Sequence, residues 1–556
     1  MDLNLAKAPA AFPRFARHIN LLVTGPGPQE LGLPCAPAWR TLDGVLDRFA
    51  HIGTDQQLAD AIFDDRLHQP GPARISVLAG ANPGVEQYAH AWARSHGLAA
   101  LPVATTPLRL LHADVVIALG DGAATNAVLD AAADMGTATL WIAADGGLRE
   151  LIPSGDDACH GKATFSTPLA DALTAAVRRW FNPLAQAETA DPQLAALRHY
   201  ADERSARASR ERTAGLLDRI FCTVLTAEWG RWRQRLTLDP TRPDWGMPAA
   251  LPVPVTLLAR FAWSDVRANI ASGCHRSGVW LLYLLAALAV FAAVAGATSG
   301  GEAGPGWQHM LWPAMELLAL WTILALVWRV QRKDWHRRWL GHRYLAEQLR
   351  ALVMSQSFPG VTEALATPLF QRAPTGEPAL LRSAEAWLLR RTLSTEGVLP
   401  QPAALATSSL AAVVEGQQHY HRQRVLLMTA LHSRLHCAAQ VVFAMSLVGV
   451  MFHLFTAAVT GRHDTHQLLF LTAFLPAFAA ALHGIQNKLE IGHIQTMSTL
   501  AAGELEQIRQ MLESNIDDGT APLCVQQAAR RTARVMADEI RAWRQLVGEQ
   551  QPELPA

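Results

Sequence analysis

The chain has 556 residues, of which 50% are hydrophobic and only 17% are charged, and its 48 Lys and Arg balance its 48 Asp and Glu. That length is sufficient for two or three domains. A net charge of zero argues against a nucleic-acid-binding protein, which normally carries a basic excess on one domain. The high apolar fraction favours a protein that is partly cytosolic and partly in a membrane.

The cysteines and the first residues of the chain indicate its cellular compartment. The six cysteines form no CxxC pair and have no His cluster near them at metal-ligand spacing. We therefore expect reduced thiols and no metal site. Residues 1–23 lack an apolar core of signal-peptide length, so we expect membrane insertion to come from internal segments.

Apolar, strand-like runs alternate with helical segments from residue 18 to about residue 180. The runs are rich in Val, Ile and Leu and end in small residues, and they lie at 18–25, 74–80, 98–105, 113–120 and 137–143. Continuous apolar runs are typical of a parallel sheet that is covered on both faces. The sequence therefore predicts an α/β Rossmann-like domain at 1–185.

Glycines and polar residues follow three of these runs. They are Thr24 and Gly25 after the first run, Gly80, Asn82, Gly84 and Glu86 after the second, and Gly120, Asp121, Gly122, Thr125 and Asn126 after the fourth. A helix N-terminus offers unpaired N–H groups, and glycine lets a phosphate approach them closely. The Asp and Glu side chains suit ribose hydroxyls or a base edge. Each group alone also fits a tight turn, but three groups on successive strand ends favour a ligand site.

Four later segments are long and apolar enough to cross a hydrocarbon core about 30 Å thick. They lie at 278–297, 310–328, 435–459 and 467–485. The alternative for each is a buried helix of a large soluble core. Lys and Arg cluster before the first span and after the second, whereas the connector 298–309 contains neither. By the positive-inside rule we expect two hairpins in the inner (cytoplasmic) membrane, with both termini in the cytosol.

The membrane region repeats one organisation, in which a helix, a span, a short turn, a second span and an amphipathic helix follow one another. Leu345, Leu349 and Val353 mark the apolar stripe of the first amphipathic helix, and Leu500, Leu505 and Ile508 mark that of the second. These helices are expected to continue straight out of the membrane. The predicted boundaries are a helical linker at 186–254, two-span units at 255–390 and 410–515, a loop at 391–409, and a C-terminal helix and tail at 516–556.

Four polar residues fall inside the predicted spans, namely Glu316, Gln440, His453 and His483. An ionisable group at membrane depth is costly and usually faces a bundle interior or water. We therefore consider these residues as candidates to line a pore. For Glu316 the alternative is a hydrated position near the interface, because it lies only a few residues into its span.

Two N-terminal segments, "AGANPGVEQYAHAWARSHGL" (79–98) and "HADVVIALGDGAATNAVLDAAADMGTATLWIA" (112–143), resemble the SLOG superfamily of Rossmann-like domains. The resemblance implies a site for a nucleotide derivative that is lined by Gly80, Asn82, Gly84, Glu86, Asp121, Gly122 and Thr125. Residues 255–515, most clearly "RYLAEQLRALV" (343–353), resemble the SLATT type of two-helix membrane effector. Such effectors accompany SLOG domains in bacterial conflict systems.

Together these features predict a membrane-bound sensor-effector, acting as a homo-oligomer, that binds a nucleotide-derived signal and permeabilises the membrane. By the resemblance, its role would be anti-phage defence. The alternatives are a membrane-anchored SLOG enzyme that processes a nucleotide, and a nucleotide-gated ion channel. Phosphoribohydrolase members of SLOG carry PGGxGTxxE where this chain has "GDGAATNAVLD", so no Glu occupies the catalytic position. We therefore predict no catalytic residue and no cofactor other than the ligand.

Overall fold

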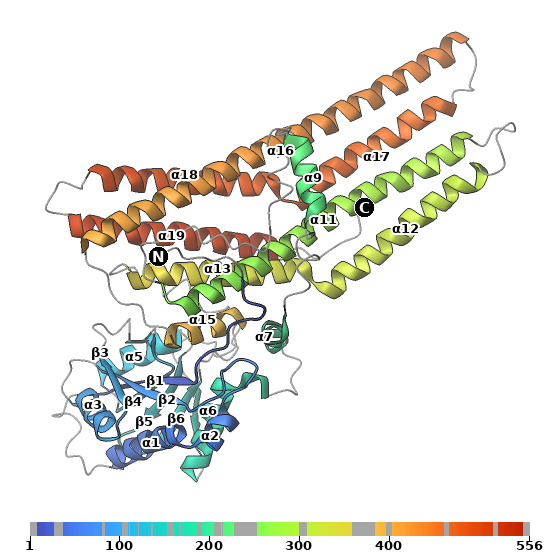
Figure 1. Ribbon diagram of the computed structural model, residues 1–556. Helices are drawn as coiled ribbons and strands as arrows, with labels where there is room; N and C mark the ends of the chain where they lie inside the picture. The colour runs from blue at the N-terminus through green and yellow to red at the C-terminus, as the bar shows by residue number, and fades with distance from the viewer. Residues whose placement is uncertain are drawn as a thin grey trace.

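The computed structural model consists of an N-terminal α/β domain and a mostly helical remainder (Figure 1). It describes residues 8–548 apart from 27–36, 80–83, 103–108, 111, 121, 135–136, 153–160, 166–167, 186–191, 205–212, 214, 227–252, 300–307, 358–383, 396–402, 461–465 and 515–520.

The α/β domain is built on a sheet of seven described strands in the order β3-β2-β1-β4-β5-β6-β7. Their bounds are β1 (His18–Thr24), β2 (Arg74–Ala79), β3 (Ala99–Pro102), β4 (Val115–Leu119), β5 (Ala138–Ile142), β6 (Leu148–Ile152) and β7 (Gly161–Thr164). The five predicted strands are confirmed, and they pair in parallel. The sequence analysis missed β6 and β7, which pair antiparallel at one edge. Neither carries the continuous apolar run that marks a strand buried on both faces.

Helices cover both faces of the sheet. On one face lie α1 (Pro37–Thr54), α2 (Gln56–Ile62), α3 (Val85–Ser95) and α6 (Leu169–Phe181), which is followed by the short helix η1 (Pro183–Ala185). On the other face lies α5 (Ala123–Asp134). The strand order reverses between β1 and β4, whose following helices α1 and α5 lie on opposite faces. In such sheets a crevice opens at the carboxyl ends of the two strands.

The helical remainder contains two copies of one arrangement, α11-α12-α13 and α16-α17-α18. The helices are α7 (Pro192–Asp202), α9 (Leu216–Thr226), α11 (Val255–Ser299), α12 (Gln308–Lys333), α13 (Trp335–Ser357), α15 (Ala384–Thr395), α16 (Ala403–Thr460), α17 (His466–Lys488), α18 (Ile491–Ser514) and α19 (Ala521–Gly548). The predicted loop at 391–409 is thus shorter than expected. Helix α15 continues to Thr395, because the side chains of its last turns are held by the α/β domain.

The sequence analysis expected the amphipathic helices to continue straight from the spans, and this expectation is wrong. Each copy breaks at one residue with a left-handed backbone, Asp334 with φ 45° after α12 and Glu490 with φ 50° after α17. A residue in this conformation ends the helical hydrogen-bond ladder, and the next helix then starts in a new direction. Figure 1 shows the change of direction between α12 and α13.

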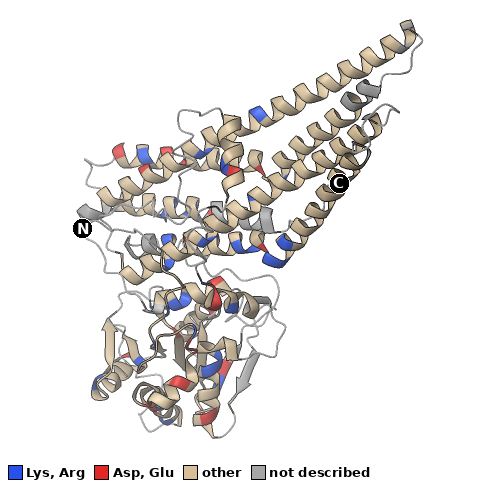
Figure 2. Cartoon of the chain, turned by 45° about the vertical axis from the view of Figure 1, so that its right-hand side comes forward, with Lys and Arg blue, Asp and Glu red and all other residues tan. Residues whose placement is uncertain are grey.

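The outer parts of four helices form what we call the arm, residues 278–297 of α11, 310–328 of α12, 435–459 of α16 and 467–485 of α17. Glu316 is the only Asp, Glu, Lys or Arg in these ranges, and Figure 2 shows the arm almost free of charged residues. The helices pack in the order α12-α11-α17-α16 (Figure 1). Phe291 of α11 lies between Trp312 of α12 and Phe474 of α17, at ring-centroid distances of 5.9 and 5.2 Å.

The surface of the arm is apolar. Trp321 is 66% exposed and Phe455 is 64% exposed, and many neighbouring Leu, Val and Met side chains are exposed as well. Such a surface is unfavourable in water and fits the hydrocarbon core of a bilayer. By length and composition, three segments of the described chain can cross a membrane: Val255–Thr298, Met310–Leu352 and Thr407–Thr456. They contain the first two predicted spans and most of the third, which was expected to end at residue 459; the fourth, in α17, is not among them.

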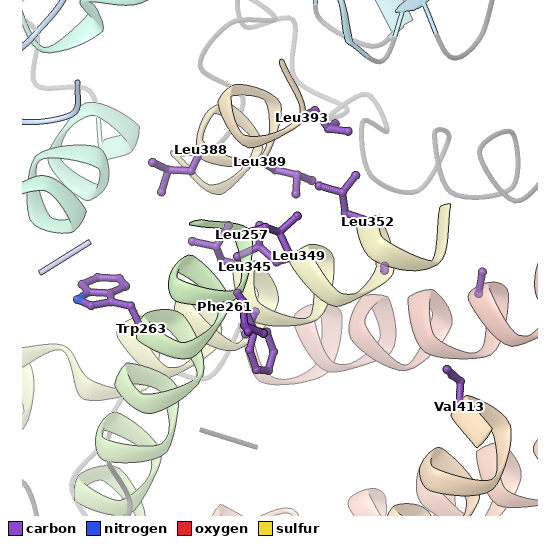
Figure 3. Packing of buried hydrophobic residues seen from close by; sticks show 14 of the residues in the cluster. Leu257, Phe261, Trp263, Leu345, Leu349, Leu352, Leu388, Leu389, Leu393 and Val413 are labelled. Atoms are coloured by element: carbon purple, nitrogen blue, oxygen red, sulfur yellow. The ribbon is translucent and has the colours of Figure 1, made fainter. Parts of the chain in front are cut away.

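The two parts of the chain share one hydrophobic core. Phe12, Phe15 and Leu67 of the α/β domain belong to the same buried cluster as residues of α11, α13, α15 and α16. Figure 3 shows Leu388, Leu389 and Leu393 of α15 above Leu345 and Leu349 of α13. The α/β domain is therefore packed onto the helices and is not joined to them only by a linker.

We predict that Gly484→Ala lowers the stability of the protein by about 1–3 kcal/mol, because the added Cβ overpacks the α11–α17 contact. A Cβ at Gly484 would clash with Cε1 of Tyr283 on α11. The measurement is the apparent melting temperature of the full-length protein in detergent. Gly503→Ala on α18 is the matched control, since a Cβ there meets nothing within 4 Å. The control should hold or raise the melting temperature through its gain in helix propensity. Equal melting temperatures would contradict the packing.

Candidate functional site

The three groups of predicted ligand residues meet at the carboxyl edge of the sheet. Gly25 follows β1, and a Cβ at this position would lie 2.8 Å from Cγ2 of Val85 and 3.0 Å from the carbonyl oxygen of Leu119. The end of β1 therefore touches the first residue of α3 and the last residue of β4. This close approach requires glycine at position 25, whether or not Gly25 also contacts a ligand. Thr24, the last residue of β1, is buried beside it.

Glycine backbones shape this edge at two further places. Gly84 precedes α3 with φ 107° and ψ −125°, a conformation that is open essentially only to glycine. Gly120 follows β4 with φ 74°, and its carbonyl oxygen accepts a hydrogen bond of 3.0 Å from Nε1 of Trp141. The first-turn amides of α3 have no acceptor within their own helix, so they are available to an anion. Gly80, Asn82 and Asp121 lie outside the described residues.

Glu86, which the sequence analysis assigned to a ribose or a base, has a protein partner. Nη1 of Arg109 lies 2.9 Å from its Oε2, and each side chain is 7% exposed. Sequence reasoning missed Arg109, because it stands in an apolar run, "LRLL", without a motif. Nε of Arg109 is buried and has no hydrogen-bond partner within the described part of the chain. The pair therefore places a cation with a spare donor near the start of α3.

The first turn of α5 contributes a second unused donor. Oγ1 of Thr125 is buried and has no hydrogen-bond partner among the residues that the structure describes. Its neighbour Asn126 is exposed, and Gly122 is half-buried. A buried hydroxyl without a partner is unfavourable, and this cost is removed when a ligand atom accepts its hydrogen bond. With the helix starts and Arg109, this edge suits a ligand that carries anionic oxygens.

The opposite, amino edge of the sheet is occupied by α15, and we call this contact the α15 interface. Nη1 of Arg391 donates to Oδ1 of Asp114 at 2.7 Å, and its Nη2 donates to the carbonyl oxygen of His18 at 3.0 Å. Arg390 donates to the carbonyl oxygen of Ala113 at 3.1 Å and to Oγ1 of Thr137. These acceptors stand at the start of β1 or just before β4 and β5. The candidate ligand edge therefore faces away from α15.

Burial dominates the electrostatics of the α15 interface. Arg391 and Asp114 are each 3% exposed. Desolvation lowers the pKa of Arg391, and the Asp114 carboxylate opposes that shift. Burial likewise lowers the pKa of His112, whose Nδ1 lies 2.9 Å from the carbonyl oxygen of Leu393. Because removal of one partner leaves an uncompensated buried charge, this contact is costly to open.

A second connection runs from α7 to α13. Glu203 contacts Arg338, and its Oε2 lies 3.0 Å from Nε2 of His342. Burial disfavours the charged carboxylate, but the hydrogen bond from His342 and the charges of its basic neighbours outweigh it and lower the pKa of Glu203 to about 2. The hydroxyl of Tyr200 donates to Oε1 of Glu385 on α15 at 2.9 Å. Residues at the end of α7 and just after it thus contact both α13 and α15.

The polar residues of the spans do not converge within one chain. Glu316 and His453 are half-buried, whereas Gln440 and His483 are exposed. His483 lies 3.2 Å from the side-chain amide of Asn487. Glu316 belongs to α12 and Gln440 to α16, which occupy opposite ends of the helix row (Figure 1). A lining that uses both residues would therefore need more than one copy of the chain.

Comparison with protein-family models, with curated proteins and with solved structures found no match to this chain. Among the described residues, no group of three His, Cys, Asp or Glu side chains is placed to hold a metal ion. The function must therefore be argued from the geometry of the two sheet edges and the arm.

We predict that Thr125→Val holds or raises the melting temperature of the ligand-free protein, because it removes an unpaired buried hydroxyl. The same variant should reduce the rise in melting temperature that a bound nucleotide causes. The measurement is thermal unfolding of the full-length protein with and without ATP or NAD.

Thr139→Val is the matched control, since Oγ1 of Thr139 is buried and donates to the carbonyl oxygen of Thr137 at 2.9 Å. It should lose about 1 kcal/mol of stability and keep the nucleotide-dependent rise. If Thr125→Val keeps the full rise with a nucleotide that stabilises the wild type, Thr125 does not contact the ligand.

Proposed function

We propose that this protein is a membrane-bound sensor-effector, in which a nucleotide-derived ligand binds the carboxyl edge of the sheet and changes the state of the membrane arm. The observation that carries the proposal is the α15 interface. It joins the amino edge of the sheet, through buried charges and a shared apolar core, to the helices that extend into the arm. A shift of the sheet on ligand binding would therefore be transmitted to α15 and α13.

The ligand class follows from the donors at the carboxyl edge. Two helix starts, Arg109 and the Thr125 hydroxyl all suit anionic oxygens, and a switch point between β1 and β4 is where nucleotides bind in open α/β sheets. The resemblance of 79–98 and 112–143 to SLOG domains supports the same class. With the SLATT-like character of 255–515, it supports a role in bacterial anti-phage defence.

The arm supports action on a bilayer. We propose that α17 inserts as a fourth span beside the three apolar segments, that the protein is multi-pass in the inner membrane, and that both termini are cytosolic. The outer faces of α12 and α16 are apolar and exposed at the two ends of the row. Side-by-side assembly of copies would cover these faces and could bring Glu316 of one chain near another chain. We therefore propose a homo-oligomer as the active form.

Two other functions remain as outcomes of the test. A membrane-anchored nucleotide-processing enzyme is disfavoured because "GDGAATNAVLD" lacks the catalytic Glu of the phosphoribohydrolase pattern. A nucleotide-gated ion channel shares the same parts as the effector. It differs in whether ion flow is physiological or destructive.

The deciding experiment reconstitutes the full-length protein in liposomes and measures ion and dye release with ATP, NAD and related nucleotides. The full chain is required, because residues 1–190 alone would expose Phe12, Phe15 and Leu67, which are buried against the helices. Release that depends on a nucleotide supports the proposal. Consumption of the nucleotide without release would establish the anchored enzyme instead.

We predict that Arg391→Ala uncouples the two parts. Nucleotide affinity should stay nearly unchanged, whereas nucleotide-dependent release should fall about fivefold or more, a usual size for allosteric coupling. Affinity and release are measured on the same preparation. Arg178→Ala, on the exposed side of α6, is the control and should change neither quantity. Full release from Arg391→Ala, with the variant folded, would place the coupling outside the α15 interface.

We predict that Glu316→Gln lowers cation conductance several-fold while assembly is retained, because a carboxylate beside a water-filled path attracts cations. Conductance is measured in planar bilayers, and assembly is measured by size-exclusion chromatography. Gln440→Leu tests in the same way whether a residue of α16, at the other end of the row of helices, affects conductance. Unchanged conductance in Glu316→Gln would mean that this residue is only hydrated at the interface.

A further inference from the structure

A hollow lies where the arm joins the rest of the helices. It is lined by His275, Arg276, His336, Trp339, Lys488, Leu489 and Glu490. His275 and Arg276 belong to α11, and His336 and Trp339 lie in the first turns of α13, just after the break at Asp334. Lys488, Leu489 and Glu490 lie at the break between α17 and α18. The two helix breaks of the repeat thus lie on either side of α11 and enclose one small space.

The walls of the hollow are aromatic and basic. The His275 ring lies 4.7 Å from that of His336 and is stacked 6.0 Å from that of Trp339. Nη1 of Arg276 lies 3.8 Å from Oδ2 of Asp218, whereas its Nη2 is buried and has no hydrogen-bond partner among the described residues. Lys488 adds a second cation, and Glu490 is the one carboxylate that lines the hollow. An anion at the hollow could accept a hydrogen bond from the unused donor of Arg276 and pair with Lys488.

The hollow lies at the level where charged residues begin. The preceding arm is almost free of them, as Figure 2 shows, and basic residues follow at once at the end of α12. The guanidinium of Arg332 lies 4.2 Å above the Trp328 ring, and that of Arg329 lies 5.9 Å from the Trp335 ring. A belt of Trp and Arg marks the boundary between hydrocarbon and water in membrane proteins.

Helix α9 gives independent evidence for the same boundary. It runs across α11 and α16 where the arm begins (Figure 1). Inward, Asp218 accepts a hydrogen bond of 3.0 Å from Nε1 of Trp280. Outward, Leu216, Ile220 and Val224 form an exposed apolar stripe one helical turn apart. A short helix that lies across the spans with one exposed apolar face is typical of an interfacial helix. Asp218 also pairs with Arg276, so α9 and the hollow lie at the same depth.

We propose that this hollow binds the phosphate group of an anionic phospholipid in the adjoining leaflet. The hollow is small and open at its mouth, so the phosphate group would lie at the mouth, beside Arg276 and Lys488. Basic hollows between membrane helices on the cytosolic side commonly hold lipid headgroups. The inference rests on the proposed membrane placement of the arm, and it does not depend on a ligand at the sheet edge.

Bound lipid would link the two halves of the repeat. The phosphate would contact Arg276 before the first span and Lys488 after the fourth, beside both helix breaks. Occupancy would then hold α13 and α18 in a fixed relation to α11. Anionic lipid is therefore expected to stabilise the packing of the two units.

The test uses the full-length protein in liposomes of phosphatidylcholine alone and of phosphatidylcholine with phosphatidylglycerol. Flotation reports membrane placement, and native mass spectrometry reports phospholipid that stays bound after extraction. Lys488→Gln should reduce retained phosphatidylglycerol about fivefold, the effect of one surface Lys on anionic lipid. Lys333→Gln is the matched control, since Lys333 ends α12 as Lys488 ends α17 but does not line the hollow. Glu490→Gln removes the carboxylate and should increase retention.

Each outcome decides between named alternatives. Equal losses from Lys488→Gln and Lys333→Gln would mean general surface attraction and would overturn the proposal. Binding of inorganic phosphate to the detergent-purified protein, without retained phospholipid, would assign the hollow to a soluble phosphate compound and would also overturn it. Failure to float with either liposome would contradict the membrane placement itself. Flotation without selective retention would contradict the lipid site alone.

Discussion

The buried pair between Arg391 and Asp114 joins two parts of the chain that are 277 residues apart in sequence. A guanidinium and a carboxylate that are each 3% exposed are stable only while they remain paired, so α15 and the amino edge of the sheet are held in one geometry. The shared apolar core around Phe15 and Leu388 adds hydrophobic burial to the same interface. This ion pair and the shared core together fix the position of the α/β domain on the helical remainder.

The amino edge of the sheet is occupied by α15, and the two edges have opposite chemistry. The amino edge contains ionic groups that are already paired, whereas the carboxyl edge contains helix starts and, counting the described residues alone, an arginine with a spare donor and a hydroxyl without a partner. The molecule therefore separates a fixed contact at one edge of the sheet from the proposed ligand site at the other. This arrangement suits a sensor more than an anchored enzyme, because an anchor needs no buried connection to the sheet.

The repeat determines where the apolar arm ends. In both copies charged side chains resume in the last turn of the apolar helix, α12 or α17, and one left-handed acidic residue, Asp334 or Glu490, follows. Helix α9 and the basic hollow lie at the same level. The apolar arm, helix α9 and the charged helices beyond it thus form three successive zones. Their order is that of the hydrocarbon, headgroup and aqueous layers of a bilayer.

The sequence by itself determined the five parallel strands, the long apolar helices and the repeat, because each depends on a continuous run or a period of neighbouring residues. It also located the glycines at 25, 84 and 120, whose conformations or close contacts no larger residue permits. Only the tertiary structure decided the strand order, the pairing of Glu86 with Arg109, the burial of Arg390 and Arg391 at the predicted start of a loop, and the hollow at Lys488. Each of these depends on partners distant in the chain, and the local sequence carries no signal of which distant group will compensate a buried charge.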